Sequence, residues 1–159
     1  MIKISVPGSK SITNRALIAA ALARGKSWLV NPLESDDPKF LKRALAKLGV
    51  SIRTKKGDVH IKGGALKESK KPLFCGNAGT AVRFLTAVLA TQPFKSIVTG
   101  DARMQKRPMK DLIDALQMLG ANIDSIKSTG CPPVKIYGPL VGGTCHLRGN
   151  VSSQFLSGL

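Results

Sequence analysis

The sequence is poor in aromatic residues and has no long apolar run. Only 4% of its 159 residues are aromatic, with one Trp and one Tyr. Proteins that bind single-stranded nucleic acid stack bases on aromatic rings, so this scarcity argues against such a platform. No apolar run approaches the roughly 20 residues that span a bilayer. The short run 16–23 follows basic residues, as in a signal peptide, but Pro7 and Gly8 interrupt the region before it. We therefore expect a helix there and a cytoplasmic protein.

Cysteine is also scarce and metal-ligand patterns are absent. Cys75, Cys131 and Cys145 make an odd number and contain no CxxC pair. This spacing argues against a disulfide framework and against a structural zinc site, and it favours reduced thiols. His60 and His146 have no nearby ligand partner, and we interpret both as ordinary strand positions.

Acidic residues are few. The sequence has nine acidic residues and 25 basic ones, which gives a net charge of +16. Residues 1–75 hold 16 of the basic side chains. Such a field favours anionic partners: phosphorylated metabolites, nucleic acid or acidic lipid. One cluster has no interleaved aromatic residue and is expected to be a solvated face: Lys55, Lys56, Lys62, Lys67, Lys70 and Lys71.

Two glycine-led polar loops, residues 7–15 and 76–83, run directly into apolar helical stretches. Small loop residues let backbone N–H groups approach a ligand, and the helix N-terminus adds partial positive charge. Lys10 and Arg15 add full charges in the first loop. Each loop has an arginine seven residues after its leading glycine, so both favour anion binding.

Apolar periodicity and Gly/Pro punctuation predict an α/β chain. The second predicted helix has Asp37 as its N-cap, Pro38 in its first turn and Gly49 beyond its end. The expected helices are 11–23, 38–48, 78–91 and 109–119. The expected strands are 27–31, 50–54, 58–62, 95–99, 121–127, 133–137 and 144–148.

The order of elements recurs along the chain. The segment 44–52 matches 115–123 in pattern 71 residues later, and Gly8 to Arg15 matches Gly76 to Arg83 at an offset of 68. We interpret this as a structural repeat of roughly 70 residues. A third glycine-led loop begins at Gly149 and turns into an apolar helix. The predicted units are 1–75, 76–148 and the start of a third at 149–159, so we expect the N-terminal piece of a longer protein.

A third basic loop, 100–108, follows a strand and carries three positive charges at 103, 106 and 107. A loop of this kind on a rigid scaffold suits a second anion, although a solvated loop is the alternative. The first loop is no Walker motif, because one glycine precedes Lys10 where GxxxxGK[ST] needs two, so nucleotide hydrolysis is disfavoured. Four carboxylates near helix starts are expected to serve as caps and not as a catalytic base: Asp36, Asp37, Asp101 and Asp111.

Four motifs in order give the chain a family resemblance: Pro7-Gly8-Ser9-Lys10-Ser11 with Asn14-Arg15, Gly76-Asn77-Ala78-Gly79-Thr80-Ala81 with Arg83, Arg103-Met104 with Arg107-Pro108, and Val151-Ser152-Ser153-Gln154-Phe155. Together they resemble 5-enolpyruvylshikimate-3-phosphate synthases. UDP-N-acetylglucosamine enolpyruvyl transferases share that fold but resemble these loops less closely.

The resemblance implies a fold of βαβαββ units in an inside-out barrel, here with two units complete, a third truncated and the C-terminal domain absent. It implies transfer of the enolpyruvyl group of phosphoenolpyruvate to the 5-hydroxyl of shikimate 3-phosphate, in chorismate and aromatic amino acid biosynthesis. It implies no metal or organic cofactor, no nucleic-acid or membrane partner, and a full-length protein that is usually monomeric. A basic nucleic-acid-binding module and a sugar-nucleotide enolpyruvyl transferase are the alternative functions.

The resemblance also implies roles for individual residues. Lys10 would contact both substrates. Shikimate 3-phosphate would be held by Ser11, Arg15, Ser152, Ser153 and Gln154, with Gln154 also reaching phosphoenolpyruvate. The phosphoenolpyruvate pocket, which glyphosate also occupies in the family, would be lined by Asn77, Gly79, Thr80 and Arg103.

The sequence also departs from the family pattern. The groups that move protons come from the family's C-terminal domain, so no catalytic residue is expected in this segment and the chain alone is expected to be inactive. Phe84 stands where many members have proline, in the helix behind the glyphosate pocket.

Overall fold

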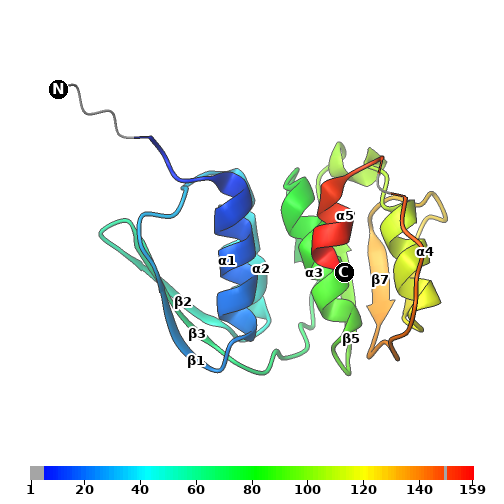
Figure 1. Cartoon of the computed structure of the whole chain (residues 1–159), viewed down its shortest axis with the longest axis horizontal. Coiled ribbons are helices and arrows are strands. Elements are labelled where there is room, and N and C mark those ends of the chain that lie inside the picture. Colours follow the sequence, from blue (N-terminus) through cyan, green and yellow to red (C-terminus); the bar gives the residue numbers. More distant parts are fainter. Residues whose placement is uncertain (1–5, 149) are drawn as a thin grey trace.

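A computed structural model describes residues 6–148 and 150–159 of the chain. The predicted α/β class is confirmed, because helices and strands alternate through both halves (Figure 1). Residues 1–5, at the start of the first predicted unit, and Gly149, which leads the third loop, lie outside the described residues. The helices are α1 (Lys10–Leu22), α2 (Asp36–Lys47), α3 (Gly79–Ala90), α4 (Lys110–Met118), α5 (Ser153–Gly158) and the 3-10 helix η1 (Met104–Lys106). The strands are β1 (Gly25–Leu29), β2 (Ser51–Lys55), β3 (Asp58–Gly63), β4 (Leu73–Phe74), β5 (Lys95–Thr99), β6 (Asn122–Ser125) and β7 (Val134–Tyr137).

The first half of the chain forms an antiparallel sheet covered on one face by two helices. The strand order is β1-β3-β2, and α1 and α2 pack against the sheet (Figure 1). Strands β2 and β3 are joined by a two-residue turn at Lys56 and Gly57, with φ values of 52° and 86°. Positive φ at both positions matches the right-handed twist of a hairpin, as the Lys-Gly-Asp sequence predicted. Val59 and Ile61 point into the core and alternate with more exposed neighbours.

The second half of the chain forms a sheet in which three strands are connected as in the first sheet. Its sheet has the order β4-β5-β7-β6, in which β5, β7 and β6 follow one another as β1, β3 and β2 do in the first sheet. Strand β4 pairs in parallel with β5, and the other pairs are antiparallel. The sequence did not predict β4, because two residues are too few to show a strand alternation.

The two halves meet at helix α3. It contacts α1 and α2 of the first half, and α4, α5 and strands β5 and β7 of the second. Ten of its residues are buried, from Gly79 to Ala90. A helix that is buried on nearly every side is a core element, so α3 fixes how the two halves sit together (Figure 1).

Two sequence predictions, a strand and an N-cap, were wrong in detail. No strand forms at 144–148, so His146 lies in irregular chain and not on a strand. Helix α2 begins one residue earlier than Asp37, with Ser35 at the N-cap position and both aspartates in its first turn. The segment 144–148 alternates in polarity, but it has no neighbouring strand among the described residues, and backbone groups need such a partner to form a ladder.

The packing of Gly63 gives a stability test. A Cβ atom at Gly63 would lie 2.1 Å from the carbonyl oxygen of Ala20 and 2.5 Å from that of Ala23. Those atoms are helix backbone and cannot rotate away, so Gly63→Ala is expected to lower the free energy of unfolding by about 2 kcal/mol or more. Urea unfolding followed by circular dichroism measures this.

Gly57→Asn is the matched control for Gly63→Ala. Gly57 has a positive φ, but a Cβ atom there would meet no other atom within 4 Å, and Asn tolerates that backbone conformation. Gly57→Asn is expected to lower the free energy of unfolding by no more than about 1 kcal/mol. Equal losses in the two variants would show that the close approach of β3 to α1 does not limit stability.

Candidate active site

The loops predicted to bind anions meet at one pocket of about 560 Å³. It lies at the N-terminal ends of α1 and α3 and beside the first turn of α5. Residues far apart in the sequence are thereby brought together. The lining residues are Lys10, Asp36, Asp37, Phe40, Phe74, Gly76, Asn77, Ala78, Gly79, Thr80, Asp101, Arg107 and Gln154.

Lys10 is the first residue of α1. Ser9 is the N-cap, and its hydroxyl accepts a hydrogen bond from the N–H of Ile12 at 3.4 Å. Gly8 lies against the chain at 31–33, where a Cβ would be 2.8 Å from the nitrogen of Leu33. Helix α1 has no acidic residue in its first turn. A lysine at the positive end of a helix is electrostatically unfavourable until an anion binds, so this end of α1 suits an anionic ligand.

The second loop places small residues at the start of α3. Gly76 has a φ of 53°, and a Cβ there would lie 2.4 Å from the ring of Phe40. A Cβ on Gly79 would lie 2.7 Å from Nη1 of Arg107. Glycine therefore suits position 76 in both conformation and space, and at position 79 it leaves room for the Arg107 guanidinium group. The first turn of any helix also leaves backbone N–H groups without intrahelical acceptors.

The loop that leads into α5 contributes Gln154. Ser152 caps α5, and its hydroxyl accepts a hydrogen bond from the N–H of Gln154 at 3.2 Å. The side-chain oxygen of Gln154 accepts from Nη1 of Arg83 at 2.6 Å. The fully buried ring of Phe155 packs beneath the same guanidinium, with 4.9 Å from Cζ to the ring centroid.

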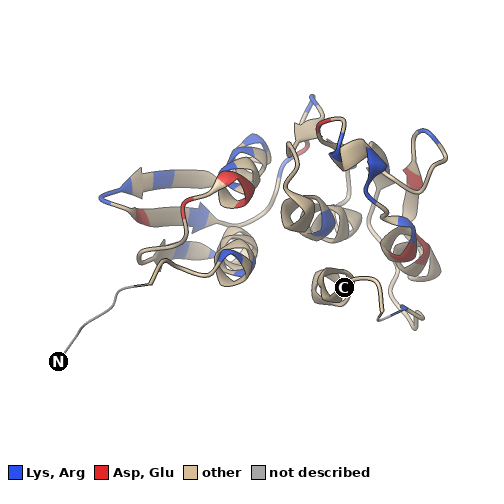
Figure 2. Cartoon of the chain, turned by 90° about the horizontal axis from the view of Figure 1, so that it is seen from above, with Lys and Arg blue, Asp and Glu red and all other residues tan. Residues whose placement is uncertain are grey.

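The pocket lining carries charges of both signs, and its cations are Lys10 and Arg107. Burial lowers the pKa of Arg83, and the neighbouring charge of Arg107 lowers it further. Within residues 6–148 and 150–159 the ion pairs are Lys42–Glu34 and Lys110–Asp114, and neither includes a pocket residue. Figure 2 shows how few acidic residues accompany the basic ones over the whole chain. Three carboxylates do line the pocket: Asp36, Asp37 and Asp101.

The structure brings half of the predicted site residues to this pocket: Lys10, Asn77, Gly79, Thr80 and Gln154. The others do not line it: Ser11, Arg15, Arg103, Ser152 and Ser153. Ser152 and Ser153 begin α5 beside Gln154, and Ser11 follows Lys10 in α1. Arg103 is exposed in the loop before η1. The roles predicted for these ten residues stay predictions.

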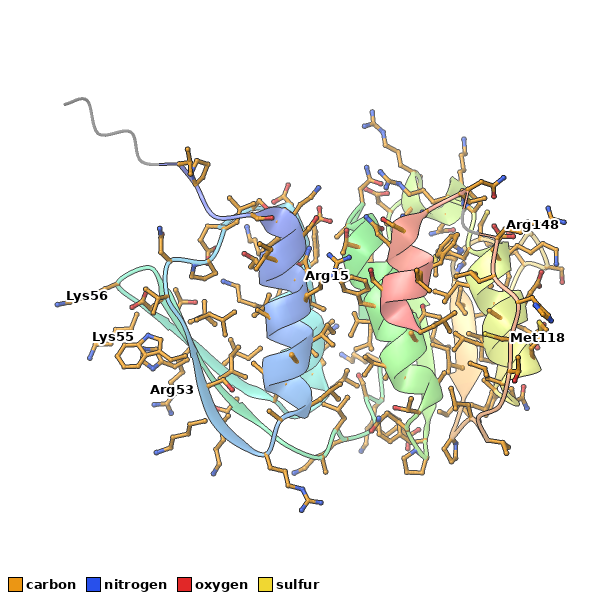
Figure 3. All side chains as sticks on the ribbon, viewed as in Figure 1. Arg15, Arg53, Lys55, Lys56, Met118 and Arg148 are labelled. Carbon is orange, nitrogen blue, oxygen red and sulfur yellow. The ribbon has the colours of Figure 1, made fainter. Side chains whose placement is uncertain are left out.

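Arg15 occupies a different groove. Its Nη2 donates to the hydroxyl of Ser157 at 2.6 Å, and its guanidinium lies over the ring of Phe84 at 5.1 Å. Figure 3 shows Arg15 in the space between α1 and the α3–α5 pair. A groove of about 190 Å³ is formed there by Arg15, Ile18, Ala19, Phe84, Val88, Ser157 and Gly158.

Sequence reasoning missed Arg107 as an individual pocket residue. It belongs to the basic loop 100–108, but spacing gave no reason to prefer it over Arg103. Residue 107 follows η1 directly, and η1 is fixed by Asp101, whose carboxylate accepts from the N–H of Met104 at 2.9 Å. The carboxylates at 36, 37, 101 and 111 were predicted to be caps. Asp101 does bond to the start of η1, but Asp36, Asp37 and Asp111 lie in the first turns of α2 and α4, which have no side-chain cap. Only the folded chain shows that the carboxylates at 36, 37 and 101 face the pocket.

Comparisons with known proteins identify the family of this chain. A family model described as EPSP synthase (3-phosphoshikimate 1-carboxyvinyltransferase) matches residues 2–159. The chain belongs to the EPSP synthase family. The resemblance predicted from the four motifs is thus confirmed.

Individual members of the EPSP synthase family are similar over nearly the whole chain. A 3-phosphoshikimate 1-carboxyvinyltransferase of Thiobacillus denitrificans is 47% identical over 98% of this chain and 37% of its own length. One from Shewanella baltica is 44% identical over 99% of this chain and 38% of its own length. A solved EPSP synthase structure from Acinetobacter baumannii has a TM-score of 0.86 at 36% identity, covering 99% of this chain and 36% of that one. The chain therefore spans little more than a third of the length of these relatives.

The structure shows neither a membrane helix nor a metal cluster in the part of the chain that it describes. No helix there is both long and apolar enough to cross a bilayer. No group of three or more His, Cys, Asp or Glu residues there could hold a metal ion.

Cys75, just before the second loop, gives a pH test. Its thiol is fully buried, and burial raises its pKa from 9.0 to about 12, with a small opposing effect of Lys47. A group whose pKa is higher in the folded state stabilises the fold below its unfolded pKa and loses that contribution as pH rises towards the folded value. The difference in free energy of unfolding between the wild type and Cys75→Ala should therefore shrink between pH 9 and pH 12, by up to about 1.4 kcal/mol per pH unit.

Denaturant titrations at pH 8, 9 and 10 measure that difference. Cys131→Ala is the control, because Cys131 is only half-buried. A difference that is constant with pH would contradict the buried, protonated state of Cys75.

Proposed function

We propose that the protein to which this chain belongs transfers the enolpyruvyl group of phosphoenolpyruvate to the 5-hydroxyl of shikimate 3-phosphate, in chorismate and aromatic amino acid biosynthesis. The bond from the enol carbon to the phosphate oxygen breaks, a bond to the 5-oxygen forms, and the 5-hydroxyl loses its proton as phosphate leaves. The products are 5-enolpyruvylshikimate 3-phosphate and phosphate.

One observation carries this proposal: three glycine- or serine-led loops, far apart in the sequence, meet at one pocket that contains a lysine and a guanidinium group. Lys10 of α1, Gly79 and Thr80 of α3, and Gln154 of α5 line the same cavity. Both substrates carry phosphate and a carboxylate, and lysine, guanidinium and helix N-termini are suited to such groups. The names of the relatives favour shikimate 3-phosphate over a sugar nucleotide.

We propose the residue roles that the family resemblance implies. Lys10 contacts both substrates, and shikimate 3-phosphate is held by Ser11, Arg15, Ser152, Ser153 and Gln154. The phosphoenolpyruvate side is formed by Asn77, Gly79, Thr80 and Arg103. Arg15 and Arg103 lie outside the pocket lining, so their roles require side-chain movement or groups from the rest of the protein.

We further propose the domain organisation and cellular setting. Residues 1–75 and 76–148 are two units of the first domain, and 149–159 begin a third, with the remaining domain supplied by further chain. The equivalent strand orders of the two sheets support the first two units. The protein works in the cytoplasm as a monomer, with no metal or organic cofactor and with neither nucleic acid nor membrane as a partner.

Calorimetric titration with shikimate 3-phosphate tests the substrate side of this proposal. The wild-type chain should bind, and Lys10→Ala should weaken binding at least about tenfold, because a charge-assisted hydrogen bond to the ligand is lost. Gln154→Ala should weaken it to a similar degree. Lys62→Ala is the control, because Lys62 is exposed on β3 and does not line this pocket. Binding that is unaffected by Lys10→Ala would place the ligand elsewhere.

A second test concerns turnover. We expect no phosphate release when the chain is mixed with phosphoenolpyruvate and shikimate 3-phosphate, because the groups that move protons belong to the rest of the protein. A coupled assay for inorganic phosphate measures this. Steady release by the purified 159-residue chain would show that the catalytic groups lie within it.

A further inference from the structure

Arg83 is a half-buried cation that sits beside the pocket and does not line it. It projects from α3 towards α5, where its Nη1 lies 2.6 Å from the side-chain oxygen of Gln154. Its guanidinium also stacks on the ring of Phe155, at 4.9 Å from Cζ to the centroid. The Phe155 ring is fully buried, so the guanidinium rests on a fixed surface.

Arginine and glutamine can pair in only one orientation. A guanidinium group has N–H donors and no acceptor, whereas a glutamine amide has one acceptor oxygen and one NH2 donor. The oxygen of Gln154 must therefore face Arg83. Since Gln154 lines the pocket, the NH2 group is left to face it.

The Gln154 backbone is fixed as well. The hydroxyl of Ser152 accepts from its N–H at 3.2 Å, which sets the start of α5. Both ends of the Gln154 side chain are thus restrained, one by the cap and the other by Arg83. A restrained donor loses little conformational entropy when a ligand binds.

Arg83 is poorly suited to bind the anion directly. The guanidinium that approaches Gly79 most closely belongs to Arg107, whose Nη1 would be 2.7 Å from a Cβ there, against 3.7 Å for Nη1 of Arg83. Arg107 lines the pocket and Arg83 does not. The Nε atom of Arg83 is buried without a hydrogen-bond partner among the described residues. The surroundings of the guanidinium therefore do not satisfy all of its N–H donors. The Nη1 atom of Arg83 is instead positioned to donate to the side-chain oxygen of Gln154.

We propose that Arg83 is a positioning residue: it fixes the Gln154 amide so that the NH2 group donates to an oxygen of the anionic ligand. The inference rests on the proposed function, because the ligand is taken to be shikimate 3-phosphate. The consequence is selectivity. At this point the pocket accepts phosphate, carboxylate or ether oxygens and disfavours ligand groups that can only donate.

Side-chain amide resonances of the ¹⁵N-labelled chain test this directly. The Gln154 NH2 pair is identified by its loss in Gln154→Leu. In the wild type it should shift on titration with shikimate 3-phosphate and saturate together with binding. In Arg83→Met the ligand-free pair should move to the position of freely rotating exposed glutamines, the ligand-dependent shift should vanish, and affinity should fall about tenfold. Arg83→Lys keeps one donor and should restore part of the shift.

Arg53→Met is the matched control. It removes the same group from β2, where Arg53 is exposed on the first sheet, away from the pocket (Figure 3). The Gln154 resonances of Arg53→Met should match those of the wild type. A ligand-dependent Gln154 shift of unchanged size in Arg83→Met would overturn the proposal. If that variant does not fold, an unchanged shift in Arg83→Lys, whose shorter side chain lacks the planar fork, would do so.

The same spectra separate this inference from the proposed function. Ligand-dependent shifts at Lys10 and the α3 start without one at Gln154 would overturn the positioning role alone. If no resonance of the folded wild type responds to shikimate 3-phosphate, the proposed function fails for this chain, and the donor role of Gln154 fails with it. The ligand-free comparison of the wild type with Arg83→Met would still decide whether Arg83 holds the amide.

Discussion

The burial of helix α3 is the constraint on which the rest of the structure depends. Ten of its residues are buried, and it contacts α1, α2, α4 and α5. Here the helix-covered faces of the two sheets share one core because α3 stands between the helices of both halves. Because α3 is surrounded, the loop that precedes it lies beside the loops that precede α1 and α5. The pocket is therefore a consequence of core packing: large apolar side chains such as Leu85 and Leu89 place Gly79 and Thr80.

Two arginines at equivalent positions of the repeat connect neighbouring helices in the same way. Arg15 stacks on Phe84 and donates to Ser157, while Arg83 stacks on Phe155 and donates to Gln154. Arg15 reaches from α1 to α3 and α5, and Arg83 reaches from α3 to α5, each with an aromatic face beneath the guanidinium. Stacking and a charge-assisted hydrogen bond use the planar, fork-shaped group in ways that lysine cannot. In a chain with 4% aromatic residues, two of the five phenylalanines, Phe84 and Phe155, lie under arginines, and the Phe155 contact is the one beside the pocket.

Most of the fold could be predicted from local signals. Gly49 and Gly120 end helices, and Lys56-Gly57 forms the hairpin turn, because their φ values are positive where few other residues are comfortable. Strand β4 and the absence of a strand at 144–148 could not be predicted, because pairing depends on whether a neighbouring strand is present. In the site, Lys10 and Gln154 were identified from their loops, whereas the choice of Arg107 over Arg103 as a lining residue depends on the turn of η1.

By itself, the sequence determined the α/β class and membership of the EPSP synthase family, and it predicted a repeat of roughly 70 residues and anion-binding loops. The fold class follows from periodicity and glycine, which act over a few neighbouring residues, whereas the family follows from four short motifs in order along the chain. Only the tertiary structure decided which loop residues share a pocket, that Arg15 lies in a separate groove, and that the Gln154 amide turns its oxygen towards Arg83. Such facts depend on contacts between residues far apart in the sequence, and close packing of side chains, not local spacing, sets them.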